Sequence, residues 1–96
     1  MRALWKGSNF AWRVNPRMRQ ATHQLKSIVF EICGKKCARC GFAVATIDHV
    51  LPYSYGGQTI PSNLQPLCSA CNNAKRDRNA VDYRSAEMRQ RLQEWD

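Results

Sequence analysis

The chain has 96 residues, and its 15 Lys and Arg against 7 Asp and Glu give a net charge of +8. Its apolar runs are too short to span a bilayer and residues 1–6 lack the apolar core of a secretory signal, so we expect a cytoplasmic protein with no membrane partner. A chain this short buries a limited core, which makes a bound metal or a set of disulfides an expected stabiliser.

Basic residues flank a neutral centre. Six Lys and Arg precede the first acidic residue, Glu31, whereas residues 41–74 contain neither Lys nor Arg. Basic flanks of this kind suit a polyanion laid across the domain, so we expect a nucleic acid partner; simple solubility of a basic protein is the alternative. The expected phosphate contacts are Arg17, Arg19, Lys75, Arg76 and Arg78.

Residues 1–16 form a basic and aromatic arm with no clear period. Large aromatic side chains usually serve burial, so we expect Trp5 and Trp12 to pack on the core; an arm that grips nucleic acid is the alternative. The pair Asn15-Pro16 is typical of a helix start, with Asn as N-cap and Pro at the first helical position. A helix is therefore predicted over residues 17–34.

An apolar stripe supports this helix, because its members follow the spacing i, i+3, i+4, i+7, i+8. They are Leu25, Ile28, Val29, Ile32 and Cys33. Gly34 then supplies the stop. Since Cys33 belongs to the stripe, we interpret it as a small buried hydrophobe rather than a metal ligand.

The remaining elements are short. Residues 42–50 are rich in Val, Ile and Thr and predict a strand, followed by a loop over 51–63 that contains a Gly-Gly turn. A short return strand is predicted over 64–67, and a helix begins at Cys68. The segment 83–94 predicts an amphipathic C-terminal helix.

Two Cys-x-x-Cys pairs stand out among the five cysteines. An odd cysteine count with two such pairs favours a metal over two disulfides. A thioredoxin-type redox motif is the alternative, but there are two pairs and no βαβ context. Four thiolates close a tetrahedral zinc with no open position, so the predicted zinc site is structural. Its ligands are Cys37, Cys40, Cys68 and Cys71.

Asp48-His49 ends the predicted strand. A neutral imidazole can take a proton from water at pH 7, and a neighbouring carboxylate can hold a hard divalent cation. Taken alone, such a pair is weak evidence for catalysis, because most of them are structural or solvated.

The ordered set CARCG, IDHVLPYSYGG, SNLQPLC and CNNAK, which runs from Cys37 to Lys75, resembles the HNH endonuclease family. The resemblance implies a small α+β chain with a ββα-metal core. It implies that His49 is the general base, that Asp48 is a metal ligand and that Asn63 braces the loop and orients the base. Asn72 takes the last metal-ligand position, where the family's name has His; Asp-His…Asn…Asn also occurs in the HNH domain of CRISPR effector nucleases. Oxygen donors favour Mg²⁺ or Mn²⁺ at this second site.

The function implied is metal-dependent hydrolysis of DNA phosphodiester bonds, by nicking or double-strand cleavage. A non-catalytic zinc-knuckle module that binds nucleic acid is the alternative, and a toxin nuclease with an acidic immunity partner shares the chemistry. A stand-alone HNH domain of this length resembles small phage and prophage nucleases, including those beside the packaging machinery, which suggests packaging proteins as partners. Double-strand cleavage would need two sites, hence a second copy of the chain or two sequential nicks. We expect one domain over 1–96, with the arm over 1–16, a helix over 17–34, a zinc-stapled core over 37–78 and a C-terminal helix over 83–94.

Overall fold

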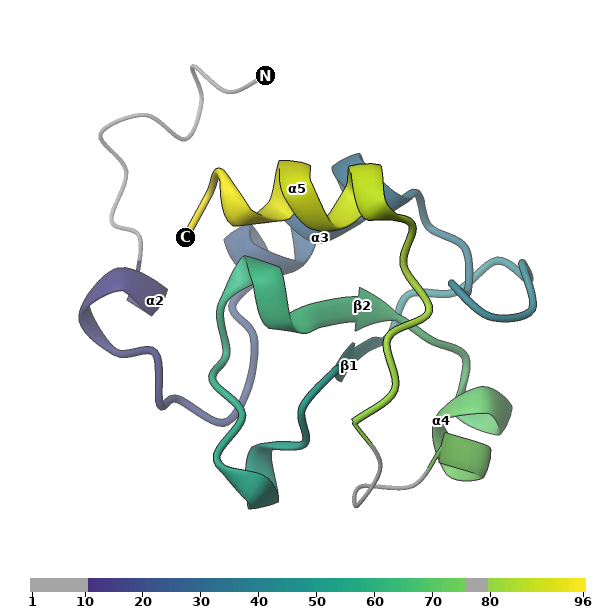
Figure 1. The fold of residues 1–96 in the computed structure, drawn as a ribbon, viewed down its shortest axis with the longest axis horizontal. Helices are drawn as coiled ribbons and strands as arrows, with labels where there is room; N and C mark the ends of the chain where they lie inside the picture. Colours follow the sequence, from purple (N-terminus) through teal and green to yellow (C-terminus); the bar gives the residue numbers. More distant parts are fainter. Residues whose placement is uncertain (1–10, 76–79) are drawn as a thin grey trace.

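The computed structural model describes residues 11–75 and 80–96 (Figure 1). Trp5, Arg76 and Arg78 lie outside this described part, so the expectations for them are not addressed below. The described elements are α2 (Ala11–Val14), α3 (His23–Cys33), β1 (Ile47–His49), β2 (Leu64–Pro66), α4 (Ser69–Lys75) and α5 (Ala86–Gln93), with two short 3-10 helices at Tyr53–Tyr55 and Pro61–Asn63. This confirms the predicted small α+β class.

An antiparallel hairpin of β1 and β2 forms the centre of the chain. Its register pairs Ile47 with Pro66, Asp48 with Gln65, and His49 with Leu64. Helix α4 follows β2 directly, which completes a strand–strand–helix unit. Strand β1 is shorter than the 42–50 expected, because the chain before it hooks back: Ala43 forms a bridge with Lys36 instead of extending the hairpin.

Helix α3 begins at His23, and the predicted start near residue 17 is wrong. Thr22 is the N-cap, and its hydroxyl accepts a hydrogen bond from the backbone N–H of Leu25 at 3.1 Å. The preceding turn uses its carbonyls elsewhere: Pro16 O accepts from the backbone N–H of Thr59 at 2.8 Å. A helix over these residues would need that carbonyl for its own backbone hydrogen bonds. The hydrogen bond with Thr59 therefore favours the turn over a helix.

The main core lies where α3 and α5 pack together on the hairpin (Figure 1). Its buried members are Trp12, Leu25, Ile28, Val29, Ile32, Leu64 and Leu92. Trp12 is 1% exposed and its indole N–H donates to the carbonyl of Trp95 at 3.2 Å, which confirms that this aromatic packs on the core. The C-terminal helix is shorter than 83–94, because Ser85 caps it by accepting from the backbone N–H of Met88 at 3.2 Å.

Residues 81–84 cross the outside of the hairpin and are held by buried Gln65. Its side-chain amide donates to Val81 O at 2.9 Å and accepts from the backbone N–H of Tyr83 at 2.9 Å. Arg84 is buried beside it, bonds both oxygens of Asp82 at 2.9 Å, and donates to Leu64 O at 3.1 Å. These contacts attach residues 81–84 to strand β2.

Within residues 11–75 and 80–96, no helix is long and apolar enough to cross a membrane.

Candidate functional site

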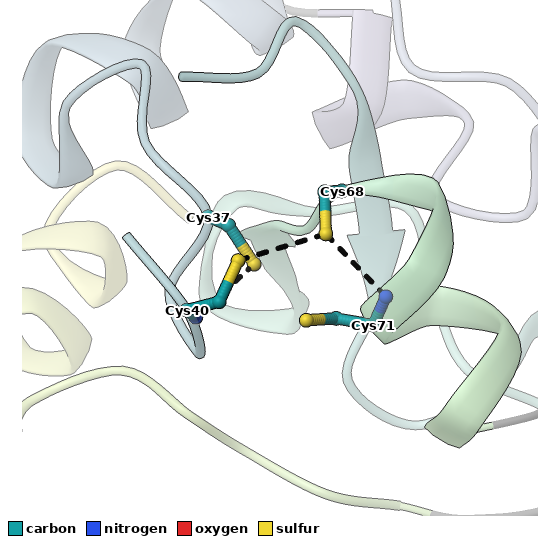
Figure 2. A group of neighbouring side chains, drawn as sticks. All are labelled: Cys37, Cys40, Cys68 and Cys71. Carbon is teal, nitrogen blue, oxygen red and sulfur yellow. Dashed lines mark hydrogen bonds between the residues drawn. The ribbon is translucent and has the colours of Figure 1, made fainter. Parts of the chain in front are cut away.

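Four cysteines from two distant segments meet at one point (Figure 2). The sulfur atoms of Cys37, Cys40, Cys68 and Cys71 all lie within 4.8 Å of one another. The sulfurs of Cys40 and Cys68 are 3.7 Å apart. A tetrahedral zinc with Zn–S bonds of about 2.3 Å would place its sulfur ligands about 3.8 Å apart. The thiol arrangement therefore fits zinc, as the sequence predicts.

Backbone hydrogen bonds shape each pair into a knuckle. The N–H of Cys40 points to the sulfur of Cys37 at 3.5 Å, and the N–H of Cys71 points to that of Cys68 at 3.4 Å. Burial acts to raise the pKa of Cys37, but hydrogen bonds from neighbouring backbone N–H groups outweigh it and lower the pKa to about 6. The side-chain hydrogen bond with Cys68 raises the pKa of Cys71 to about 12. Four thiols packed this closely lose all their protons only when a bound cation compensates the negative charge of the thiolates.

Cys33 stands outside the cluster. It is half-buried on α3 and packs against the main core. Burial raises the pKa of its thiol to about 11, so the group stays protonated. Its sulfur is not among the four that the structure brings together.

A cavity of about 270 Å³ opens between β1 and α4. Strand β1 contributes Asp48 and His49 to its lining, and helix α4 contributes Asn72 and Lys75. The remaining wall comes from Arg19, Ile47, Pro52, Tyr53 and Ser54. Strand β1 and helix α4 thus bring one expected base and two expected oxygen ligands to a single hollow.

His49 is oriented by a buried threonine. The ring Nε2 lies 2.8 Å from the hydroxyl of Thr59, which is fully buried and is also hydrogen-bonded to the carbonyl of Met18. A hydroxyl has one proton, and a carbonyl can only accept. Thr59 therefore donates to Met18, so Nε2 carries the imidazole proton and donates to Thr59. The lone pair of the neutral ring is then on Nδ1.

The surroundings of His49 favour the neutral ring. Burial lowers its pKa below the usual 6.5, and the cations Lys75 and Arg19 lower it further, against the opposing effect of Asp48. A ring that stays neutral near pH 7 can act as a general base.

Asp48 is held by two donors on one oxygen. Its Oδ2 accepts from the side-chain amide of Gln65 at 3.1 Å and lies 3.2 Å from the ammonium of Lys75. Among the described residues, no hydrogen bond reaches Oδ1. A carboxylate fixed through one oxygen keeps the other for a cation, and exposed Asn72 on the same cavity offers a second oxygen donor. The donor set therefore fits a hard divalent ion.

Lys75 does not fit the phosphate contact expected of it. The residue is 2% exposed, and its ammonium also donates to the carbonyl of His49 at 3.1 Å. A buried cation already bound to Asp48 is not presented to a surface phosphate. Lys75 instead joins α4 to β1.

Asn63 braces the loop that follows His49. Its side-chain oxygen accepts from the N–H of Leu51 at 2.9 Å, and its amide donates to Leu51 O at 3.1 Å and Gln58 O at 2.8 Å. Its own carbonyl accepts from the N–H of Val50 at 2.8 Å. Asn63 is absent from the residues that line the cavity, so its contact with the site is indirect.

The two expected arginines differ in position. Arg17 donates to Gly56 O at 2.8 Å and supports the loop, whereas exposed Arg19 lines the cavity. Both guanidinium groups lie near the ring of Tyr53, at 5.5 and 5.2 Å from its centroid. Sequence reasoning overlooked Tyr53, Thr59 and Gln65, because each acts through a contact with a residue distant in the chain.

The chain is similar to a known protein family and to a solved structure. The family model described as HNH endonuclease matches residues 31–78. No curated protein matches the chain. A solved structure, that of the Type IV phosphorothioation-dependent restriction endonuclease ScoMcrA, has a similar fold, with a TM-score of 0.53 and 22% identity over 96% of this chain. The chain spans 25% of that structure's chain. Because the family model matches half of its length, the chain belongs to the HNH endonuclease family.

Proposed function

We propose that the chain is a metal-dependent endonuclease that hydrolyses DNA phosphodiester bonds. The observation that carries the proposal is the meeting of Asp48, His49 and Asn72 around one cavity, with the His49 tautomer set by Thr59. Membership of the HNH family supports the reaction class. The similar fold of a restriction endonuclease and the net charge of +8 support DNA as the substrate.

The chemistry assigns each side chain a role. His49 Nδ1 takes a proton from a water molecule while the water oxygen bonds to phosphorus. The bond from phosphorus to the 3′ oxygen breaks and the departing oxygen takes a proton from solvent water, which leaves a 5′-phosphate and a 3′-hydroxyl. Asp48 and Asn72 would hold Mg²⁺ or Mn²⁺, which stabilises negative charge on the phosphate and the departing oxygen when bound.

The residues around this centre position it. Thr59 keeps the His49 ring in one tautomer, and Gln65 fixes the carboxylate of Asp48. Asn63 holds the loop after His49, and Arg19 on the cavity wall suits a neighbouring phosphate. The four cysteines would bind a structural zinc that stabilises the fold and takes no part in the reaction.

A plasmid-nicking assay with Mg²⁺ or Mn²⁺ tests the proposal. Wild type should convert supercoiled plasmid to open circles, and His49→Ala and Asp48→Ala should lose this activity by two orders of magnitude or more. Both variants should keep the zinc content of wild type and a cooperative thermal melt. Equal nicking by wild type and His49→Ala would sink the proposal.

A non-catalytic nucleic-acid module is the second candidate. The ion pair of Asp48 with Lys75 favours it, because this pair gives the carboxylate a structural purpose without a cation. If the chain is such a module, the wild-type protein binds DNA but does not nick it with Mg²⁺ or with Mn²⁺. The same assay therefore separates the two candidates when DNA binding is measured alongside it.

A further inference from the structure

Two more hollows continue from the active-site cavity, one adjoining it and the other adjoining the first. A cavity of about 220 Å³ shares Arg19, Ile47 and His49 with it. A third, of about 480 Å³, shares Lys26 and Ala45 with the second. The last two cavities lie between α3 and the segment 45–47, and we call them together the α3 groove.

Cations mark both ends and the middle of the α3 groove. Arg19 stands at its active-site end, Lys26 lines both of its cavities, and Lys35 lines the far end. Among the described residues, Glu31 is the one carboxylate in its lining. In the described ranges, no carboxylate lies within ion-pair distance of Lys26 or Lys35. Lys35 rests near the ring of Phe30, with 5.7 Å between its ammonium and the ring centroid, and is exposed to solvent.

The length of the groove suits several nucleotides. Helix α3 contributes residues from His23 to Glu31 to its wall. At about 1.5 Å per residue, this stretch of helix covers roughly 12 Å, which equals the rise of about three phosphates of one strand along the axis of a DNA duplex. Cations spread over this length can neutralise successive phosphates of a strand, whereas a single compact anion would reach only one of them.

We propose that the strand cut at His49 continues from the active-site cavity into the α3 groove, where Arg19, Lys26 and Lys35 contact its phosphates. The proposal rests on the nuclease function proposed above. It extends the substrate site to the N-terminal helix, outside the strand–strand–helix unit that carries the chemistry. The occupant is the backbone of a DNA strand, and the contacts carry affinity rather than sequence choice.

Binding measured against salt tests the groove separately from catalysis. In a His49→Ala background, Lys26→Gln/Lys35→Gln is compared with Lys36→Gln/Arg91→Gln, which removes the same charge from two exposed residues outside the groove. Fluorescence anisotropy with a duplex and a single-stranded 20-mer gives log Kd against log salt. Loss of two phosphate contacts should lower the slope by about 1.8 for duplex or about 1.4 for single-stranded DNA, with no comparable change in the control pair.

Two results would overturn the proposal that DNA occupies the α3 groove. One is equal slopes for the groove pair and the control pair, and the other is no DNA binding by the His49→Ala protein. With His49 intact, the groove pair should raise KM about tenfold or more and leave kcat within a factor of about two, since a remote phosphate contact supplies binding alone. If wild type nicks no DNA while the slope difference persists, the groove stands and the nuclease proposal fails.

Discussion

The ammonium of Lys75 lies 3.2 Å from Oδ2 of Asp48, and the two side chains are 1% and 11% exposed. The same ammonium donates to the carbonyl of His49. One side chain of α4 therefore holds both residues of the Asp-His pair on β1. It also keeps a positive charge beside the carboxylate that we propose as a metal ligand, so a bound cation must tolerate that neighbour.

Lys75→Met should lower stability and strengthen the response to a divalent cation. Removal of one partner of a buried ion pair leaves the other charge uncompensated, at a cost of about 3 kcal/mol. The melting temperature should fall by ~10 °C or more. Addition of Mn²⁺ should then raise it further in Lys75→Met than in wild type, because the cation replaces the lost charge. Differential scanning fluorimetry with and without Mn²⁺ gives both numbers.

Lys36→Met is the control for this experiment, because Lys36 is an exposed lysine. It should melt within about 2 °C of wild type, as surface substitutions usually do. A Lys75→Met protein that melts with the control would show that the pair with Asp48 contributes nothing.

Thr59→Val should slow nicking while the chain still folds. Valine keeps the shape of threonine but cannot accept from His49 Nε2, so the ring loses its tautomer preference. We expect the single-turnover rate to fall about 10- to 100-fold, which is less than the typical loss of about 100- to 10,000-fold when a general base is removed altogether. Thr59→Ser keeps the hydroxyl and should retain most of the activity. ¹⁵N shifts of the imidazole should show Nε2–H in wild type; a wild-type ring protonated at Nδ1 contradicts the assignment.

Cys68→Ser should abolish zinc binding and cooperative folding, whereas Cys33→Ala should preserve both. Cys68 belongs to the cluster of four sulfurs, and Cys33 packs against the core away from it. Because zinc affinity here is also folding free energy, loss of one ligand removes much of the stability. Metal analysis should find one zinc per chain in wild type and Cys33→Ala. One zinc per chain in Cys68→Ser would refute the four-cysteine site.

The sequence predicts best the features that short motifs specify. The spacing of Cys37 and Cys40, and of Cys68 and Cys71, predicts two pairs of thiols, and the fold brings the two pairs together. The start of α3 differs from the prediction because Asn15 and Thr22 are both suitable N-caps, and the contact between Pro16 and Thr59 favours Thr22. Nothing local marks Thr59, whose partner Met18 is 41 residues away. Lys75 likewise appears as one more basic residue until the fold buries it against Asp48.

Gly57→Ala should disrupt the loop beside the active site. A Cβ at Gly57 would lie 1.8 Å from the carbonyl oxygen of Leu51, so the backbone would have to move. That shift would displace Leu51, which Asn63 holds, and we expect lower nicking activity with a melting temperature several degrees below wild type. Gly56→Ala is the matched control: its Cβ meets open space, but its φ of 91° costs about 1–2 kcal/mol, so it should also lower the melting temperature while leaving Leu51 in place and nicking near wild type. Equal loss of nicking in the two variants would contradict the close approach.

Asp82→Asn should destabilise the chain above pH 4 and lose this effect in acid. Burial acts to raise the pKa of Asp82, but the hydrogen bonds and charge of Arg84 outweigh it and hold the pKa below its usual value. A carboxyl whose pKa is lower in the folded state adds stability above its unfolded pKa of about 3.9, and this stability disappears as the pH falls through the folded pKa. Arg84 is 6% exposed, so an uncharged partner leaves it poorly compensated at neutral pH, at a cost of about 1–3 kcal/mol. Urea unfolding of wild type and Asp82→Asn at pH 7 and near pH 3 measures this effect, and the two free energies of unfolding should converge in acid. The control is Glu87→Gln, which alters an exposed carboxylate on α5 and should follow wild type at both pH values. A difference that persists unchanged at the lower pH would mean that the pair with Arg84 is not its source.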